Sequence, residues 1–193
     1  GTKVSGISKS NIRKILLPVP SIPEQKEIAK SLDDLDTLLN ALILLLKKKK
    51  DIKQAILQQL LTSKKRLPGF NQKWQSFKLG EIGSTYGGLT GKIKSDFGSG
   101  NSKYISFLNV ILNNLINTAD LEKVTVSPSE NQNNVLRGDI LFNGSSETPK
   151  EVAMCSLMDE DIPNLYLNSF CFGFRISKKN KVDVLFLTYY LRS

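Results

Sequence analysis

Apolar residues follow two different patterns, which change near residue 66. From Ile28 to Leu46 they recur at alternating steps of four and three, which places them on one face of a helix, and the seam restarts after Lys47–Lys50. No glycine or proline interrupts Glu24 to Ser63, and Pro68 and Gly69 follow. The pattern predicts one continuous helix over about 22–63, roughly 60 Å long at ~1.5 Å per residue. Its apolar seam consists of Ile28, Leu32, Leu35, Leu39, Leu42, Leu46, Ile52, Ile56 and Leu60.

The predicted helix needs a partner for this seam. A domain of about 125 residues is only about 30 Å across, so it cannot cover a helix twice as long. The seam therefore predicts a helix–helix interface of the coiled-coil type. Ser21 and Glu24 form a capping-box pattern at the helix start, and acidic residues early with basic residues late suit the helix dipole. The run Lys47–Lys50 has two interpretations, a solvated face or a phosphate-facing patch.

From Trp74 onward the pattern is rich in short strands and turns. Residues 182–191 predict a closing helix with Leu185, Phe186, Tyr189 and Tyr190 packed inward, and Asn143–Gly144 is a tight-turn signal. The fold class predicted is α+β, a long projecting coiled-coil helix followed by a compact, mainly β domain. Other predicted elements are an extended segment at 1–20, a strand or turn at 74–79, a loop at 86–91, and strands at 102–110, 123–126, 139–142, 153–158 and 170–176.

Charge and composition narrow the function. The 193 residues carry a net charge of +9, of which +8 lies in residues 1–69 and +1 in residues 70–193. Such a basic excess favours an anionic partner, nucleic acid above all, although solubility alone also accounts for it. The chain has no histidine, which removes Ser-His-Asp and Cys-His catalysis and the zinc motifs that depend on histidine. No cofactor is predicted.

The cysteines and the apolar runs bear on the compartment. Cys155 and Cys171 are the only cysteines and form no CxxC motif, which suits a reducing cytosol. The longest apolar run, Ala41–Leu46, has six residues, too few to cross a membrane, and the N-terminus has no apolar signal region. We therefore expect a cytoplasmic protein with no membrane partner.

Several segments resemble the specificity subunits of type I restriction-modification systems. Residues 15–28 (ILLPVPSIPEQKEI) are similar to the proline-then-helix start of the family's conserved region, and Leu57–Thr62 with 68–70 and Trp74 is similar to its end. Segments similar to the beginning, middle and end of a target-recognition domain are 79–82, 88–90, 138–142, 167–170, 174–175 and 186–193. Residues 1–12 resemble the segment that normally closes such a domain, yet here they come first.

The resemblance implies half a specificity subunit. Its parts are a closing segment at 1–20, a conserved spacer helix at 21–66 and a target-recognition domain at 67–193. A subunit of this kind has no chemistry of its own; it reads one half of a split target in double-stranded DNA. The implied partners are a methyltransferase (modification) subunit and, through the complex, a restriction/translocase subunit. The alternative is a coiled-coil assembly module that binds protein only, which the salt dependence of DNA binding separates from a DNA reader.

Two predicted loops carry the chemistry of sequence readout, which needs donors and acceptors for base edges and cations for phosphates. A Mg²⁺ nuclease built on Asp139, Glu147 and Lys150 is disfavoured, because the Glu-x-x-Lys spacing does not place both side chains on one face of a strand. No methyltransferase or nucleotide-binding motif occurs, so a non-enzyme is predicted. The predicted DNA contacts are Thr90, Lys92, Lys94, Lys103, Tyr104, Asn143, Ser145, Ser146, Thr148 and Lys150.

An antiparallel homodimer is the predicted assembly. An identical chain is the one partner guaranteed to be present for the seam, and a two-fold axis would place one recognition domain at each end. Residues 1–20 would then lie beside the partner's domain, which lacks the closing segment that they resemble. The target of such a dimer is an inverted repeat with a fixed gap.

Overall fold

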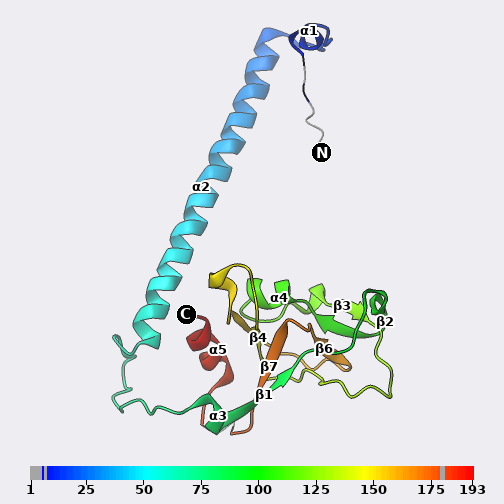
Figure 1. The fold of residues 1–193 in the computed structure, drawn as a ribbon. Coiled ribbons are helices and arrows are strands. Elements are labelled where there is room, and N and C mark those ends of the chain that lie inside the picture. Colours follow the sequence, from blue (N-terminus) through cyan, green and yellow to red (C-terminus); the bar gives the residue numbers. More distant parts are fainter. Residues whose placement is uncertain (1–5, 7, 179–180) are drawn as a thin grey trace. The chain divides into compact units, whose positions relative to one another are not determined.

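The computed structural model describes residues 6, 8–178 and 181–193 and has the predicted α+β fold class (Figure 1). The chain divides into two compact units, Gly1–Lys53 (unit 1) and Gln54–Ser193 (unit 2). One long helix, α2 (Ile22–Leu61), contributes residues to both. Within the described residues, no helix is long and apolar enough to cross a membrane.

The described residues of unit 1 include α1 (Lys9–Ile12) and the first part of α2. In α1 the hydroxyl of Ser8 accepts from the backbone N–H of Asn11, so part of the segment predicted to be extended is a helical turn. At the start of α2 the side chain that reaches back is that of Gln25, whose Nε2 donates to the carbonyl of Pro20 at 2.7 Å. The predicted contact is a different one, in which the carboxylate of Glu24 reaches back to a backbone N–H at the helix start.

The predicted long helix is confirmed, and it ends at Leu61, two residues early. The hydroxyl of Thr62 donates to the carbonyl of Gln58, a local bond that competes with further helix. Ser63 then adopts a left-handed φ of 56°, and the N–H of Lys65 donates to the carbonyl of Gln59 at 3.0 Å.

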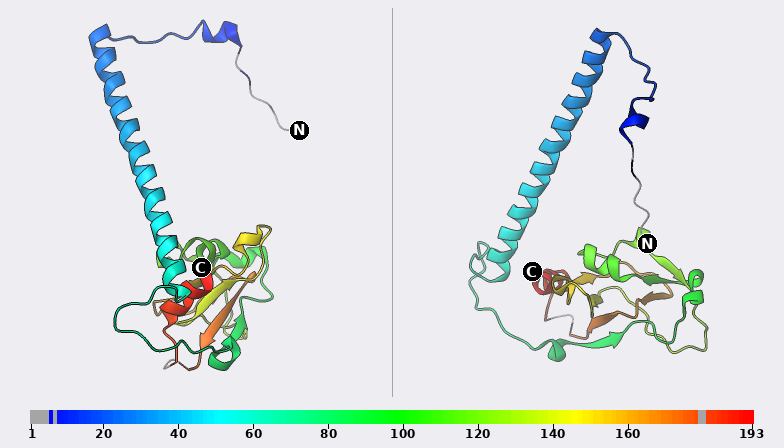
Figure 2. Two further views of the ribbon diagram at one scale, coloured as in Figure 1. Left: turned by 90° about the vertical axis from the view of Figure 1, so that its left-hand side faces the viewer. Right: turned by 45° about the horizontal axis from the view of Figure 1, so that its top comes forward.

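Unit 2 contains two small sheets (Figure 2). The first is antiparallel, in the order β1 (Gly83–Gly87), β7 (Cys171–Ile176), β4 (Ile140–Asn143) and β5 (Cys155–Leu157). In the second, β2 (Phe97–Ile105) lies between β3 (Glu122–Val124), which is antiparallel to it, and β6 (Leu165–Leu167), which is parallel. The helices are α3 (Leu79–Ile82), α4 (Phe107–Leu112) and α5 (Val184–Arg192), with 3₁₀ turns η1 (Lys94–Asp96), η2 (Thr118–Asp120) and η3 (Pro149–Glu151).

Three apolar clusters form the core of unit 2. One contains Ile105, Val110 and Leu141, and joins β2, α4 and β4. A second packs α5 on the β4–β5–β7 side through Leu187, and a third lies under β2 and β3 around Val124. Both cysteines are free and buried, and burial raises the pKa of Cys155 to about 11 and that of Cys171 to about 12.

The structure corrects several predicted elements. The strand predicted at 102–110 ends at Ile105, because Ser106 caps α4 and buried Asn109 bonds the carbonyls of Asn117 and Asp120. The Asn143–Gly144 pair makes no tight hairpin, since residues 144–154 separate β4 from β5. Residues 74–78 have no regular structure, and β1 and β6 were not predicted. On α5 the fully buried residues are Leu187 and Thr188, whereas Leu185, Phe186 and Tyr190 are exposed and Tyr189 is half-buried.

Candidate nucleic-acid interface

The loop after β4, residues 144–151, is held at both ends. The N–H of Gly144 donates to the carbonyl of Phe170 at 3.0 Å, and the Nδ2 of Asn143 donates to the carbonyl of Glu151 at 3.0 Å. Inside the loop the hydroxyl of Ser146 donates to Glu151 at 2.7 Å and accepts from the N–H of Thr148 at 3.1 Å. These hydrogen bonds fix the conformation of the loop, which lowers the entropy cost of binding a partner.

The polar side chains in and beside this loop fall into two groups, those exposed to solvent and those that hold the loop. Ser145, Thr148 and Lys150 are exposed, so they stay available to a partner, and Ser146 is half-buried. Asn143 is fully buried and holds the loop. Asn143 was predicted as a DNA contact, and in this conformation its amide is buried and has no access to a base edge.

Two aromatic rings that were not among the predicted DNA contacts complete this surface. Phe107 at the start of α4 and Phe170 before β7 line a hollow of about 570 Å³ together with Ser145 and Thr148. Phe170 is 62% exposed. Hydroxyls beside an uncovered aromatic ring suit the edge of a base pair, where hydrogen bonds and apolar contacts act together.

The second predicted loop, residues 90–94, is fastened to residues 125–132. The Nζ of Lys92 donates to Glu130 at 2.6 Å and to the carbonyl of Thr125 at 2.7 Å, and the Lys92 side chain is only 7% exposed. Gln132 accepts from the N–H of Thr90 at 3.1 Å and donates to its carbonyl at 2.9 Å. Hydrogen bonds from Lys92, Ser127 and Gln132 lower the pKa of Glu130 to about 2.

These contacts with residues 125–132 change the roles predicted for the loop at 90–94. The charge of Lys92 is compensated inside the domain, so Lys92 positions the loop rather than presenting a free cation. Thr90 and Lys94 are exposed. Sequence alone could not show the pairing, because Glu130 lies 38 residues away.

A third basic feature lies on β2 and β3. Lys103 and Lys123 face each other in register across the antiparallel pair, and both are exposed. Like charges directly opposite one another destabilise a sheet, and an anion between them would remove the repulsion. Lys123 was not among the predicted contacts. Tyr104 is buried and donates to Glu122 at 2.6 Å, with its pKa raised to about 12 by burial and that bond, so it supports the strand from behind.

Asp139 belongs to a buried structural cluster. Arg175 donates to both of its oxygens, from Nε at 2.9 Å and from Nη2 at 2.7 Å, and the hydroxyl of Tyr86 and the N–H of Leu136 donate as well. The guanidinium also lies 4.8 Å from the centre of the Tyr86 ring. Burial and Asp139 raise the pKa of Tyr86. The carboxylate therefore joins β1, β7 and the loop before β4, and its oxygens are occupied; across residues 8–178 and 181–193 no group of three metal-ligating side chains occurs.

The three features occupy different parts of unit 2. Residues 144–151 follow β4 of the first sheet, whereas residues 90–94 and the pair of Lys103 and Lys123 belong with β2 and β3 of the second. The predicted loops are thus not brought together into one cluster.

The predicted seam of α2 is open along its length. Its residues from Ile28 to Ile56 are between 45% and 58% exposed, and Leu60 is half-buried. Apolar side chains also cover other faces of the middle of the helix, with Leu38, Ile43, Leu44 and Leu45 all more than half exposed. This surface has the composition of an interaction surface.

Comparison with known proteins decides the family resemblance for the first third of the chain. Residues 1–65 match the family model described as "Type I restriction modification DNA specificity domain". The resemblance is confirmed over these residues. They comprise the N-terminal segment, α1, α2 and the turn that follows, so the specificity-domain sequence includes the entire apolar seam.

One solved structure is similar along the whole chain. It is the "Crystal structure of HsdS subunit from Thermoanaerobacter tengcongensis", with 19% sequence identity and a TM-score of 0.49. The alignment covers 100% of this chain and 46% of that one, so the present chain spans about half the length of that subunit. No curated protein matches the sequence.

Proposed function

We propose that this chain is a DNA-recognition component of a type I restriction-modification system that reads one half of a bipartite target. The observation that carries the proposal is the match of residues 1–65 to the specificity-domain family. A basic excess, an α+β unit with built loops and a helix with an open seam support it. The closing segment (1–20), spacer helix (21–66) and target-recognition domain (67–193) are the proposed divisions.

In this proposal cations hold the phosphate backbone while hydroxyls meet the bases. Lys94, Lys103, Lys123 and Lys150 supply the cations, because their ammonium groups stand on exposed residues. The hydroxyls are those of Thr90, Ser145, Ser146 and Thr148. Lys92 and Tyr104 act indirectly, by fixing the loop and strand that carry their neighbours.

The component would perform no chemistry itself. A specificity component directs a methyltransferase subunit and, through the complex, a restriction/translocase subunit to the site that it has bound. The engaged oxygens of Asp139 favour this role over a nuclease, since they leave the carboxylate no position for a metal ion. The compartment proposed is the cytoplasm, where reduced cysteines and host DNA are both found.

The proposed assembly is an antiparallel homodimer joined along α2. Residues 22–46 carry a net charge of −3 and residues 47–66 a net charge of +7. Antiparallel pairing places the acidic part of each helix against the basic part of the other, whereas parallel pairing places like charges together. Residues 1–20 of each chain then lie beside the other chain's recognition domain and complete it.

A protein-only assembly module is the second candidate, and the open seam of α2 favours it. Co-expression with a methyltransferase subunit, followed by mapping of methylated bases, tests the two functions. A DNA reader yields methylation at one defined sequence, an inverted repeat with a fixed gap. An assembly module yields a complex whose methylation pattern does not depend on residues 67–193.

A further inference from the structure

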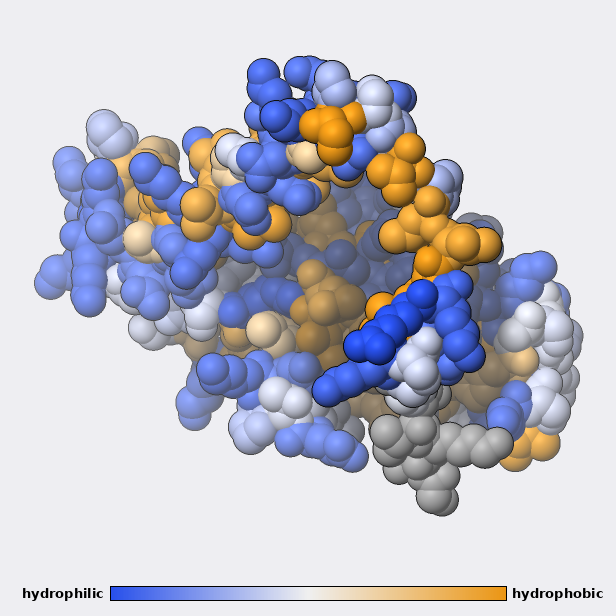
Figure 3. Space-filling view, turned by 90° about the horizontal axis from the view of Figure 1, so that it is seen from above, coloured by the Kyte–Doolittle hydropathy of each residue, from blue (hydrophilic) through white to orange (hydrophobic). Residues whose placement is uncertain are grey.

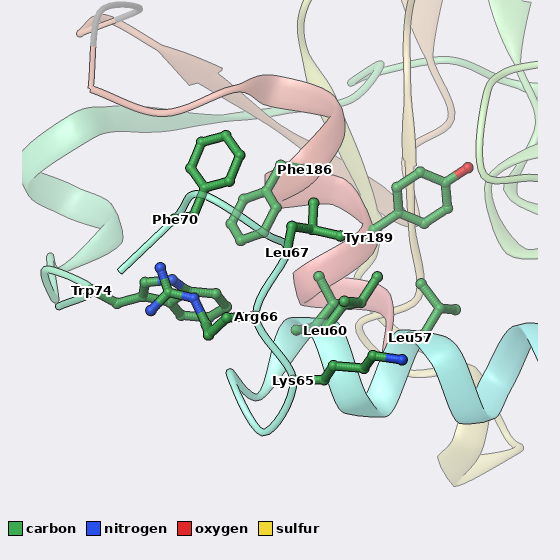
Figure 4. Close-up of a pocket in the computed structure, with 10 residues that line it drawn as sticks. Leu57, Leu60, Lys65, Arg66, Leu67, Phe70, Trp74, Phe186 and Tyr189 are labelled. Carbon is green, nitrogen blue, oxygen red and sulfur yellow. The ribbon is translucent and has the colours of Figure 1, made fainter. Parts of the chain in front are cut away.

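An apolar cavity of about 370 Å³ lies in unit 2 (Figure 4). Leucines from the last turns of α2 form one wall, and aromatic rings from the following segment and from α5 form another. Trp74 meets Phe186 edge to face, with ring centres 6.0 Å apart, and Arg66 lies 5.4 Å from the centre of the Trp74 ring. Phe70 is 63% exposed and Trp74 44%, so large apolar surfaces face outward around the cavity.

A short apolar segment of unit 1 has the complementary character. Ile15, Leu16, Leu17 and Val19 are between 55% and 96% exposed, with Leu16 at the upper limit. Figure 3 shows a run of apolar residues uncovered at the surface. Pro18 and Pro20 restrict the backbone here, which lowers the entropy cost of docking the segment in one conformation.

The segment cannot reach this cavity within its own chain. Because α2 is continuous, residue 22 is separated from residue 57 by about 53 Å at ~1.5 Å per residue. Residues 15–21 span at most about 24 Å when fully extended. Any such docking therefore joins two molecules.

The charge distribution indicates that the docking molecule is a second copy of this chain. The cavity lies at the basic end of α2 and has Lys65 and Arg66 in its lining. The apolar segment is followed directly by the acidic end, beginning with Glu24 and Glu27. A second copy laid antiparallel brings the segment to the cavity and those carboxylates to the cations at the same time.

We propose that residues 15–19 of one copy dock into the cavity beside Trp74 of the other, and the reverse, so that two equal contacts close the ends of the paired helices. The proposal rests on the homodimer proposed above. A cavity of about 150 Å³ accepts benzene, so 370 Å³ holds about two branched side chains, and Leu16 and Leu17 are the best exposed of the segment.

Trp74 is the only tryptophan of the chain, so its fluorescence reports on the cavity. The dimer dissociation constant is first measured by sedimentation. Emission and acrylamide quenching are then recorded at protein concentrations well below and well above that constant. We expect a blue shift and at least twofold weaker quenching in the dimer, because docking removes the indole from water.

The variant Leu16→Asp/Leu17→Asp tests the segment. Both positions are exposed in the single chain, so the change should leave its fold intact. We expect dimerisation at least tenfold weaker and a Trp74 that stays quenchable even when dimer forms. Leu112→Asp is the matched control, since this leucine is 73% exposed and lies on α4, away from the lining of the cavity; it should behave as the parent.

The outcomes separate this docking from the proposed function. A dimer in which Trp74 does not respond, or a chain that stays monomeric at 100-fold excess over the concentrations used for DNA binding, overturns the docking. If the same protein still directs methylation to one sequence, the proposed DNA recognition stands without it. If Trp74 responds as expected and methylation is not directed, the docking stands and the proposed function fails.

Discussion

Removing one lysine from the pair on β2 and β3 should stabilise the fold and weaken DNA binding. Lys103 and Lys123 are direct cross-strand neighbours, with Cβ atoms about 5 Å apart in such a pair. Two unit charges about 5 Å apart repel by about 0.8 kcal/mol in water, which is an upper bound here because the ammonium groups stand beyond Cβ on flexible side chains that can spread apart, and physiological salt reduces it to a few tenths. Lys103→Gln keeps the length and polarity of the side chain and removes only the charge. We therefore expect the free energy of unfolding to rise by about 0.3 kcal/mol.

The same variant should lose one phosphate contact. Each contact contributes about 0.9 to the slope of log K against log salt, which is about a 3.5-fold loss of affinity between 50 and 200 mM salt. The double variant Lys103→Gln/Lys123→Gln should lower the slope by about 1.8. Urea unfolding measures the stability, and fluorescence anisotropy with labelled duplex DNA at several salt concentrations measures the slope.

A matched lysine provides the control. Lys73 is exposed and lies in a segment without regular structure, so Lys73→Gln makes the same charge change with no lysine opposite it in a strand pair. Its stability should not rise. If Lys103→Gln destabilises the fold, Lys103 and Lys123 do not repel each other as inferred. If the double variant keeps the parent's salt slope, the pair does not contact phosphates.

Three further predictions concern the groups that hold the recognition unit together. Asp139→Asn leaves the charge of its arginine partner without compensation and should cost about 2–4 kcal/mol in urea unfolding, whereas Asp159→Asn, in an exposed ion pair, should cost less than about 0.5. The pKa of Glu130 is lowered to about 2 from an ordinary 4.5, so its contribution to the free energy of unfolding is complete above pH 4.5 and is lost as the pH falls toward 2. Glu130→Gln should therefore make the stability fall less steeply between pH 4.5 and 2. An unchanged fall would argue against the ion pair with Lys92. The two buried thiols should resist a thiol reagent at pH 8 in the folded chain and react in urea, and fast reaction without urea would contradict their burial.

The helices could be predicted where a long apolar period and local caps agree. α2 has such a period over forty residues, and α5 follows Asp183, whose carboxylate accepts from the N–H of Phe186. β6 is three residues long and pairs with β2 in parallel across some sixty residues, so nothing local marks it. β1 contains glycines, and it pairs with β7, where Gly173 makes room for the Tyr86 ring.

The candidate site was also only partly predictable from the sequence. The residue types of the two loops were visible in the sequence, and the exposure of Ser145, Thr148 and Lys150 is compatible with the predicted role. What could not be predicted is which polar groups the fold uses internally. The amide of Asn143 bonds the carbonyl of Glu151 within its own loop, and Lys92 pairs with Glu130, 38 residues away, so both contacts depend on how the loops fold. The register that brings Lys123 opposite Lys103 is likewise a property of strand pairing.

Mapping of methylated DNA after co-expression with a methyltransferase subunit tests the central claim most directly. The parent chain should direct methylation to one inverted repeat with a fixed gap. The variant Ser145→Ala/Thr148→Ala should change or relax the bases recognised while the gap stays the same, because the gap is set by α2 and not by the loop. Methylation that has no common sequence, or a pattern that stays identical when these hydroxyls are removed together with Lys103, Lys123 and Lys150, would contradict the account.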